Sequence, residues 1–274
     1  MVGGSDSYKQ SGAAVDHLCL PPDPIYDRYD PKVNDQAYVF GAEYDIWNID
    51  VKGTLFDKAK YTQKGVPCAV CRPTTPSSVI MIPENKGRYG EMYTRWGKDC
   101  CRNGSQLVYS GRVGGSNNYK HSGAAVDYLC LPSNPIYEKY DPKVNNQAFV
   151  FGAEYDIWNI NIPGTLFDKS RYTEKGVPCA VCRPTTPSNV IMIPGRNACY
   201  KGMREEYRGY LMAGYYSHVG ASEYICVDRD AGTITPKVHS WKKILYAVES
   251  MCGGPMECPP YINGAEMTCV VCSL

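Results

Sequence analysis

The sequence contains one long unit twice. Residues 2–83 align without a gap to residues 113–194, and 65 of the 82 aligned positions are identical. Most of the differences are mild, such as Asp27 against Glu138. Near identity over this length predicts that both segments form the same local structure, so the chain must be built from repeated units rather than from one irregular core.

A third, diverged copy follows. Its opening Cys199-x-x-Gly202 matches Cys101-x-x-Gly104, and its closing Cys269-Val-Val-Cys272 matches Cys179-Ala-Val-Cys182. The expected organisation is a truncated first half-unit at 2–83, a polar linker at 84–92, a second half-unit at 93–194 and a third at 195–274. Residues 93–274 would form one complete domain, whereas residues 2–83 would need the opening segment that 93–112 supplies to the second half-unit.

Local patterns favour strands. Residues 148–162 and their copy at 37–51 alternate between apolar and polar side chains and are rich in β-branched and aromatic residues. The 20 prolines and 26 glycines interrupt the chain at short intervals, and no long stretch has a helical period. The sequence therefore predicts an all-β, mainly antiparallel fold with little helix.

The 14 cysteines indicate disulfide bonds. Three pairs have the spacing Cys-x-x-Cys, but a zinc ribbon needs two such pairs close together, and these lie far apart with only four histidines in the chain. A redox site would begin a helix, whereas these motifs lie among prolines or close to residue 274. Disulfides in a secreted, extracellular protein are the favoured interpretation, although no signal peptide is visible.

Charge and hydropathy exclude other partner classes. Lys plus Arg is 29 and Asp plus Glu is 28, which gives no electrostatic reason to expect nucleic acid or an anionic membrane. No apolar run approaches the roughly 20 residues that cross a bilayer. We therefore expect a protein with no membrane span.

Catalytic signals are weak. His121 and His218 occupy matching places in two half-units, but Gln10 stands at that place in the first copy and cannot act as a base. No common nucleophile, zinc-protease or phosphate-loop motif is present. The sequence favours a protein that is not an enzyme, with no cofactor.

Two acidic and aromatic triplets are candidate ligand sites. A strand would place alternate side chains on one face, where carboxylates beside an indole could hold calcium or a sugar. The competing interpretation is a solvated strand face with a packed tryptophan. The candidates are Glu43, Asp45 and Trp47, and their copies Glu154, Asp156 and Trp158.

Longer motifs carry a family resemblance. They include Tyr93-Thr-Arg-Trp-Gly97, Val177-Pro-Cys-Ala-Val-Cys182, Glu206-Tyr-Arg-Gly-Tyr-Leu-Met212 and Cys258-Pro-Pro-Tyr-Ile-Asn-Gly264. Residues 93–274 resemble the C-terminal non-collagenous domain of type IV collagen, and more closely that of the short-chain, spongin-like collagens of invertebrates. The resemblance implies a β-rich, disulfide-stapled domain that directs chain assembly. The chain departs from the family because it has no Gly-X-Y tract and one half-unit too many.

The resemblance also implies how the cysteines pair. Within a half-unit the first cysteine would bond to the last, and the second to the next-to-last. The implied bonds are Cys19–Cys68, Cys101–Cys182, Cys130–Cys179, Cys199–Cys272 and Cys226–Cys269, with Cys252–Cys258 closing a short extra loop. Cys71 and Cys100 are then left over, and we predict an intrachain bond between them; the alternative is that one of them forms an interchain bond.

The expected function is a secreted extracellular-matrix or recognition module that mediates protein–protein assembly. Its partners would be other copies of itself or related matrix proteins, most simply in a two-fold homodimer. The alternative is a soluble multivalent lectin, because tandem repeats of a weak sugar site would gain affinity through avidity.

Overall fold

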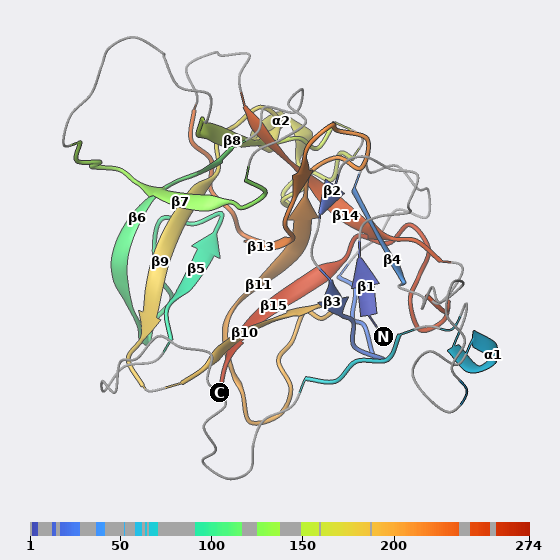
Figure 1. Ribbon diagram of the computed structural model, residues 1–274. Coiled ribbons are helices and arrows are strands. Elements are labelled where there is room, and N and C mark those ends of the chain that lie inside the picture. The colour runs from blue at the N-terminus through green and yellow to red at the C-terminus, as the bar shows by residue number, and fades with distance from the viewer. Residues whose placement is uncertain are drawn as a thin grey trace.

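Strands dominate the computed structural model (Figure 1), which describes residues 2–4, 13–14, 17–27, 37–41, 52, 58–61, 64, 66–70, 91–116, 125–137, 149–158, 160–186, 188–235, 242–252 and 256–274. The elements are β1 (Val2–Gly4), β2 (Ala13–Ala14), β3 (Leu18–Cys19), β4 (Ala37–Gly41), α1 (Lys58–Tyr61), β5 (Tyr93–Trp96), β6 (Ser105–Gly115), β7 (Leu129–Pro132), β8 (Phe151–Tyr155), α2 (Lys169–Tyr172), β9 (Pro178–Pro184), β10 (Val190–Pro194), β11 (Arg204–Ala213), β12 (Ala221–Ser222), β13 (Ile225–Asp228), β14 (Lys243–Ser250) and β15 (Thr268–Ser273). The predicted disulfide-rich, all-β fold is confirmed. Among the described residues, no helix is long and apolar enough to span a membrane.

The sequence repeat reappears as repeated strand pairing. In the first half-unit Val2 pairs with Cys19, and 111 residues later Val113 pairs with Cys130. Strands β1 and β4 pair in the same register as β6 and β8. The short helices α1 and α2 are related by the same offset. Identical residues therefore form identical antiparallel pairs.

The diverged third copy keeps this pattern. Gly209 of β11 pairs with Cys269 of β15, as Gly111 of β6 pairs with Cys179 of β9. A further strand extends each of these two pairs, because β5 pairs with β9 and β10 pairs with β15. Strand β10 belongs by sequence to the second half-unit but adds to the sheet of the third.

Parallel pairs join the half-units. Strand β14 runs parallel to β8 of the second half-unit along 243–245 and parallel to β4 of the first along 248–250. Strand β5 runs parallel to β13, and β2 runs parallel to β12. Within the described residues, pairs inside a half-unit are antiparallel, so the sheet is mixed because of these junctions. All eight residues of β14 are buried, which makes this strand the centre of the molecule.

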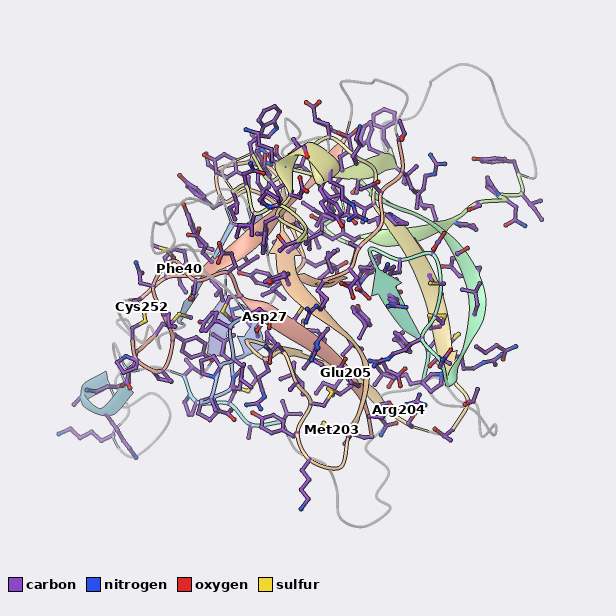
Figure 2. All side chains as sticks on the ribbon, turned by 180° about the vertical axis from the view of Figure 1, so that it is seen from behind. Asp27, Phe40, Met203, Arg204, Glu205 and Cys252 are labelled. Carbon is purple, nitrogen blue, oxygen red and sulfur yellow. A yellow bond between two sulfur atoms is a disulfide. The ribbon has the colours of Figure 1, made fainter. Side chains whose placement is uncertain are left out.

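Six disulfides staple the strands, and their sulfur atoms are drawn in Figure 2. The bonds join the six pairs of cysteines that the family resemblance implied: Cys19–Cys68, Cys101–Cys182, Cys130–Cys179, Cys199–Cys272, Cys226–Cys269 and Cys252–Cys258. The two bonds of the duplicated unit, Cys19–Cys68 and Cys130–Cys179, share a Cα–Cα distance of 5.7 Å.

The prediction for the two leftover cysteines is wrong. Cys100 carries a free, exposed thiol, so it does not bond to Cys71, which lies outside the described residues. Its neighbour Cys101 is half-buried and bonded to Cys182 in the sheet, whereas Cys100 lies in the preceding bend with its side chain in solvent. Counting unpaired cysteines cannot show which way a side chain points, and that direction decides whether a bond forms.

Candidate functional site

The structure gives the second acidic triplet partners of its own. Strand β8 ends at Tyr155, earlier than the strand predicted over 148–162, although burial still alternates as far as Ile157. The chain then turns, and the Asp156 carboxylate accepts a hydrogen bond from the backbone N–H of Trp158 at 3.4 Å. Burial raises the pKa of Asp156.

Both ends of this triplet already have a cationic neighbour. Glu154 forms an ion pair with Lys242 at 2.8 Å. Trp158 is 53 % exposed, and the Lys169 ammonium lies 4.3 Å from the centroid of its ring. Glu43, Asp45 and Trp47 lie outside the described residues. In the part of the chain that the structure describes, no three acidic, histidine or cysteine side chains gather as metal ligands do.

His218 packs among aromatic rings. Its ring centroid lies 5.0 Å from that of Tyr215 and 5.8 Å from that of Tyr246. Burial lowers the pKa of His218 to about 4. A neutral histidine in such a cluster serves packing. His17 is exposed, while His121 and His239 lie outside the described residues.

The low pKa of His218 makes stability depend on pH. Histidine in an unfolded chain titrates near ~6.5, so between that value and about 4 the unfolded chain binds more protons than the folded one. The contribution of neutral His218 is therefore complete above about pH 6.5 and is lost as the pH falls through about 4. Urea unfolding of the wild type between pH 7 and 4 should show this loss, and His218→Gln should reduce it. His17→Gln, at an exposed histidine, is the control. If the unfolding free energy of His218→Gln falls with pH as steeply as that of this control and of the wild type, the assignment is refuted.

The duplicated motif Cys-Leu-Pro-x-x-Pro-Ile-Tyr is docked in its first copy. We call residues 24–26 the docked PIY segment. The backbone N–H of Ile25 donates to the Gly195 carbonyl at 2.6 Å, and the Thr268 hydroxyl donates to the Ile25 carbonyl. The Tyr26 hydroxyl lies 3.1 Å from that of Ser250. All these partners belong to the third half-unit, so this segment closes the junction between the first and third half-units.

The same motif is bare in its second copy, residues 135–137, which we call the exposed PIY segment. Ile136 is 94 % exposed and Tyr137 is 75 % exposed, although both match the docked residues in type. Leu129, at the start of β7, is also exposed. Two copies of one motif thus have opposite environments, which sequence alone could not reveal.

The junction between the second and third half-units contains the same kind of backbone hydrogen bond to a glycine carbonyl as the docked copy. After β13, the backbone N–H of Gly232 donates to the Gly97 carbonyl at 2.7 Å. Gly97 follows β5 and Gly195 follows β10, and each donates its own N–H to the strand beside it, to the carbonyls of Pro178 and Thr268 respectively. Each closed junction therefore presents the carbonyl of a glycine that follows β10 or β5 to the segment that follows β3 or β13, respectively.

A second bare surface lies in the first half-unit. Residues 66–70 match 177–181 at every position, and in the second half-unit Val177, Cys179 and Ala180 are fully buried, with Cys179 and Ala180 lying between β5 and β6. In the first half-unit this stretch forms no strand, and Val70 is 68 % exposed. Within the described residues, the exposed PIY segment and residues 66–70 are two stretches where a repeat copy is uncovered while its counterpart is covered, and Val150, 57 % exposed against a fully buried Val39, is a further such position.

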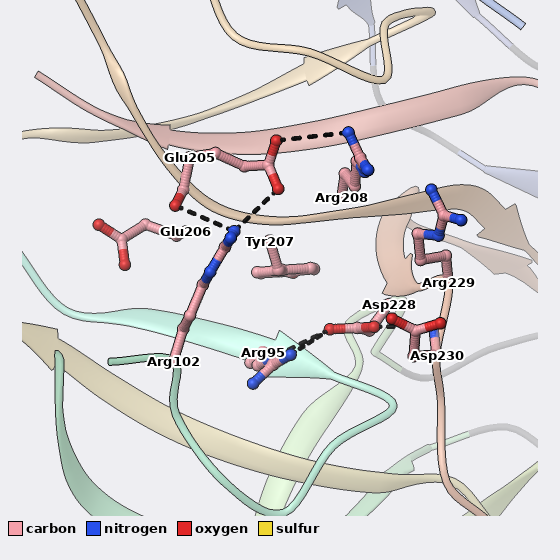
Figure 3. A pocket seen from close by; sticks show the side chains of 9 residues that line it. All are labelled: Arg95, Arg102, Glu205, Glu206, Tyr207, Arg208, Asp228, Arg229 and Asp230. Carbon is pink, nitrogen blue, oxygen red and sulfur yellow. Dashed lines mark hydrogen bonds and ion pairs between the residues drawn. The ribbon is translucent and has the colours of Figure 1, made fainter. Parts of the chain in front are cut away.

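A charged cleft of about 350 Å³ lies where the second half-unit meets the third (Figure 3). At its floor, Arg95 of β5 donates through Nε to Asp228 at 2.8 Å and forms an ion pair with the same carboxylate at 2.7 Å. The Glu206 carboxylate is buried. Burial alone would raise the pKa of Glu206, but hydrogen bonds from Ser273, Arg204, Tyr93 and Ser105 outweigh it and hold that pKa below its usual value.

The rim of the cleft is different from its floor. Arg102, Arg208 and Arg229 are about half exposed, and Arg102 and Arg208 share one carboxylate, Glu205, at 2.8 and 3.8 Å. Among the described residues, the ion-pair partner of Arg229 is Asp27, at 3.9 Å. Figure 2 shows the face that carries Asp27 and Glu205. Sequence patterns did not indicate this cleft, because its residues come from three separate segments.

A comparison of the sequence with models of known protein families finds none that matches this chain.

Proposed function

We propose that this protein is a secreted, non-enzymatic assembly module that associates with a second copy of itself. The exposed PIY segment and residues 66–70 form the contact. The observation that supports this proposal is the contrast between the docked PIY segment and its identical, uncovered copy. Its six disulfides suit an oxidising, extracellular location. The resemblance to collagen non-collagenous domains points to the same role.

The two bare surfaces have the chemistry of an interface. In the docked copy the PIY segment bonds its backbone N–H and C=O to a neighbouring half-unit and packs its tyrosine against the core. The exposed copy offers the same groups to solvent. Covering one such apolar side chain contributes about 1.5–3 kcal/mol. Residues 66–70 form no strand with any described segment, so their backbone is of the kind that an added chain can cover.

A two-fold dimer satisfies both surfaces together. Each copy carries one exposed PIY segment and one bare stretch at 66–70, so two copies can each cover the other's surfaces. Such an arrangement is closed and leaves neither surface in solvent.

A charge placed on the exposed PIY segment should abolish this association. Ile136→Asp puts a carboxylate where the proposed interface is dry, and we expect dimer affinity to fall by about tenfold or more. At a concentration where the wild type is monomeric, the melting temperature should not change, because Ile136 contacts little within its own chain. Sedimentation velocity over a concentration series measures the dimer, with Val219→Asp as the control because Val219 is exposed on the third half-unit. A wild-type protein that stays monomeric throughout, or an Ile136→Asp protein that associates normally, would rule out the proposal.

A further inference from the structure

The rim of the charged cleft keeps unused hydrogen-bond donors. Among the described residues, Arg102, Arg208 and Arg229 form their ion pairs through Nη1, which leaves the Nε and Nη2 donors of all three without a carboxylate there. A planar guanidinium binds carboxylate or sulfate oxygens with two parallel hydrogen bonds. The three side chains line one cleft, so one ligand can reach more than one of them (Figure 3).

The four carboxylates of the cleft differ in how far they are already occupied by hydrogen-bond donors. Asp228 is buried against Arg95, and the buried Glu206 accepts hydrogen bonds from four side chains. Glu205 is divided between two arginines, so neither has a full counter-charge. Asp230 is exposed; its backbone N–H donates to Asp228, and the structure gives its carboxylate no partner among the described residues. The cleft therefore offers strong donors and one free carboxylate acceptor.

This pairing of groups selects a class of ligand. Four arginines and four acidic residues line the cleft, so its net charge is near zero and it does not attract a dense polyanion such as nucleic acid. An inorganic anion would use the arginines and leave Asp230 opposing it. A sugar that bears an acidic group uses both, because its hydroxyls can donate to the carboxylate. A volume of about 350 Å³ lies at the small end of ligand sites.

We infer that this cleft binds an acidic sugar, with the guanidinium groups of Arg102, Arg208 and Arg229 holding its carboxylate or sulfate and Asp230 accepting its hydroxyl protons. This site is separate from the proposed dimer surface and does not depend on it. It differs in place and chemistry from the Glu154 triplet that the sequence suggested.

Calorimetric titration of the full chain tests the inference with four probes. They are a hyaluronan tetrasaccharide, a heparin-derived tetrasaccharide, neutral cellotetraose and sodium sulfate. We expect at least one acidic tetrasaccharide to bind at least about tenfold more tightly than cellotetraose and sulfate. Equal binding of cellotetraose or of sulfate, or no binding of either acidic probe, would overturn the inference.

Three variants locate the site. Arg102→Ala with Arg208→Ala removes two rim donors and should weaken binding of the acidic probe about tenfold or more. Glu205→Gln removes the competing carboxylate and should strengthen it. Arg112→Ala removes an exposed arginine of β6 outside the cleft and should change nothing. Unchanged binding in the double variant, with melting temperatures confirming that each protein is folded, would contradict the assignment.

Discussion

Replacing Gly209 with alanine should destabilise the protein by about 3 kcal/mol or more, or prevent it from folding. A Cβ at Gly209 of β11 would lie 1.7 Å from the Val227 carbonyl oxygen of β13. Both atoms are fixed by the backbone of paired strands, so no side chain can move aside to make room. The strands would have to separate, which breaks the pairing of β11 with β13.

We expect the same loss of stability when the corresponding glycine of the second half-unit, Gly111, is replaced with alanine. A Cβ at Gly111 would lie 1.8 Å from the Leu131 carbonyl oxygen. Gly152→Ala is the matched control, because Gly152 lies in β8 with no atom within 4 Å of an added Cβ. Urea unfolding should place this control within about 0.5 kcal/mol of the wild type. A Gly209→Ala protein as stable as Gly152→Ala would show that β11 and β13 are not as close as described.

Removing the Cys226–Cys269 bond should have a comparable effect. This disulfide closes a stretch of 43 residues and is buried in the third half-unit. On the chain-entropy model a loop of that length corresponds to about 4 kcal/mol. Double replacement by alanine also deletes two buried sulfur atoms from the core, which adds a packing loss.

The peripheral disulfide provides the comparison. Cys252–Cys258 closes a separation of only 6 residues, and the same relation gives about 2 kcal/mol. Unfolding in guanidinium chloride should therefore rank the Cys226→Ala, Cys269→Ala protein clearly below the Cys252→Ala, Cys258→Ala protein. The opposite order would show that the long loop is already constrained in the unfolded chain.

Much of the fold was predictable because equivalent residues of the two repeat copies take the same positions in strand pairing. Once Val2 and Val113 are aligned, the pairings of Cys19 and Cys130 follow, and the structure contains both. The family resemblance implied six disulfides, and all six form. Both successes depend on residues that are repeated at fixed spacing.

The contacts between half-units were not predictable in the same way. The parallel pairing of β14 with β4 and β8 joins segments whose sequences show only that each is a strand. Alternation predicted one face for Glu154, Asp156 and Trp158, but it gave no sign of the turn after Tyr155 or of the partner Lys242. These features depend on how distant segments pack together, and short-range sequence patterns do not encode that packing.

The candidate sites show the same limit. Ile25 and Ile136 lie in matching motifs, and only the position of the third half-unit makes one covered and the other exposed. The rim arginines come from β11 and from the segments after β5 and β13, so no local motif links them. Sequence found the repeated motif, while the structure identified which copy is available to a partner.

Hydrogen exchange at low and high protein concentration tests the proposed assembly most directly. Backbone amides of the exposed PIY segment and of residues 66–70 should gain protection together as concentration rises, while those of the docked PIY segment should stay equally protected throughout. Association that protects a different surface and leaves residues 135–137 and 66–70 exchanging as fast as in the dilute protein would contradict the proposal.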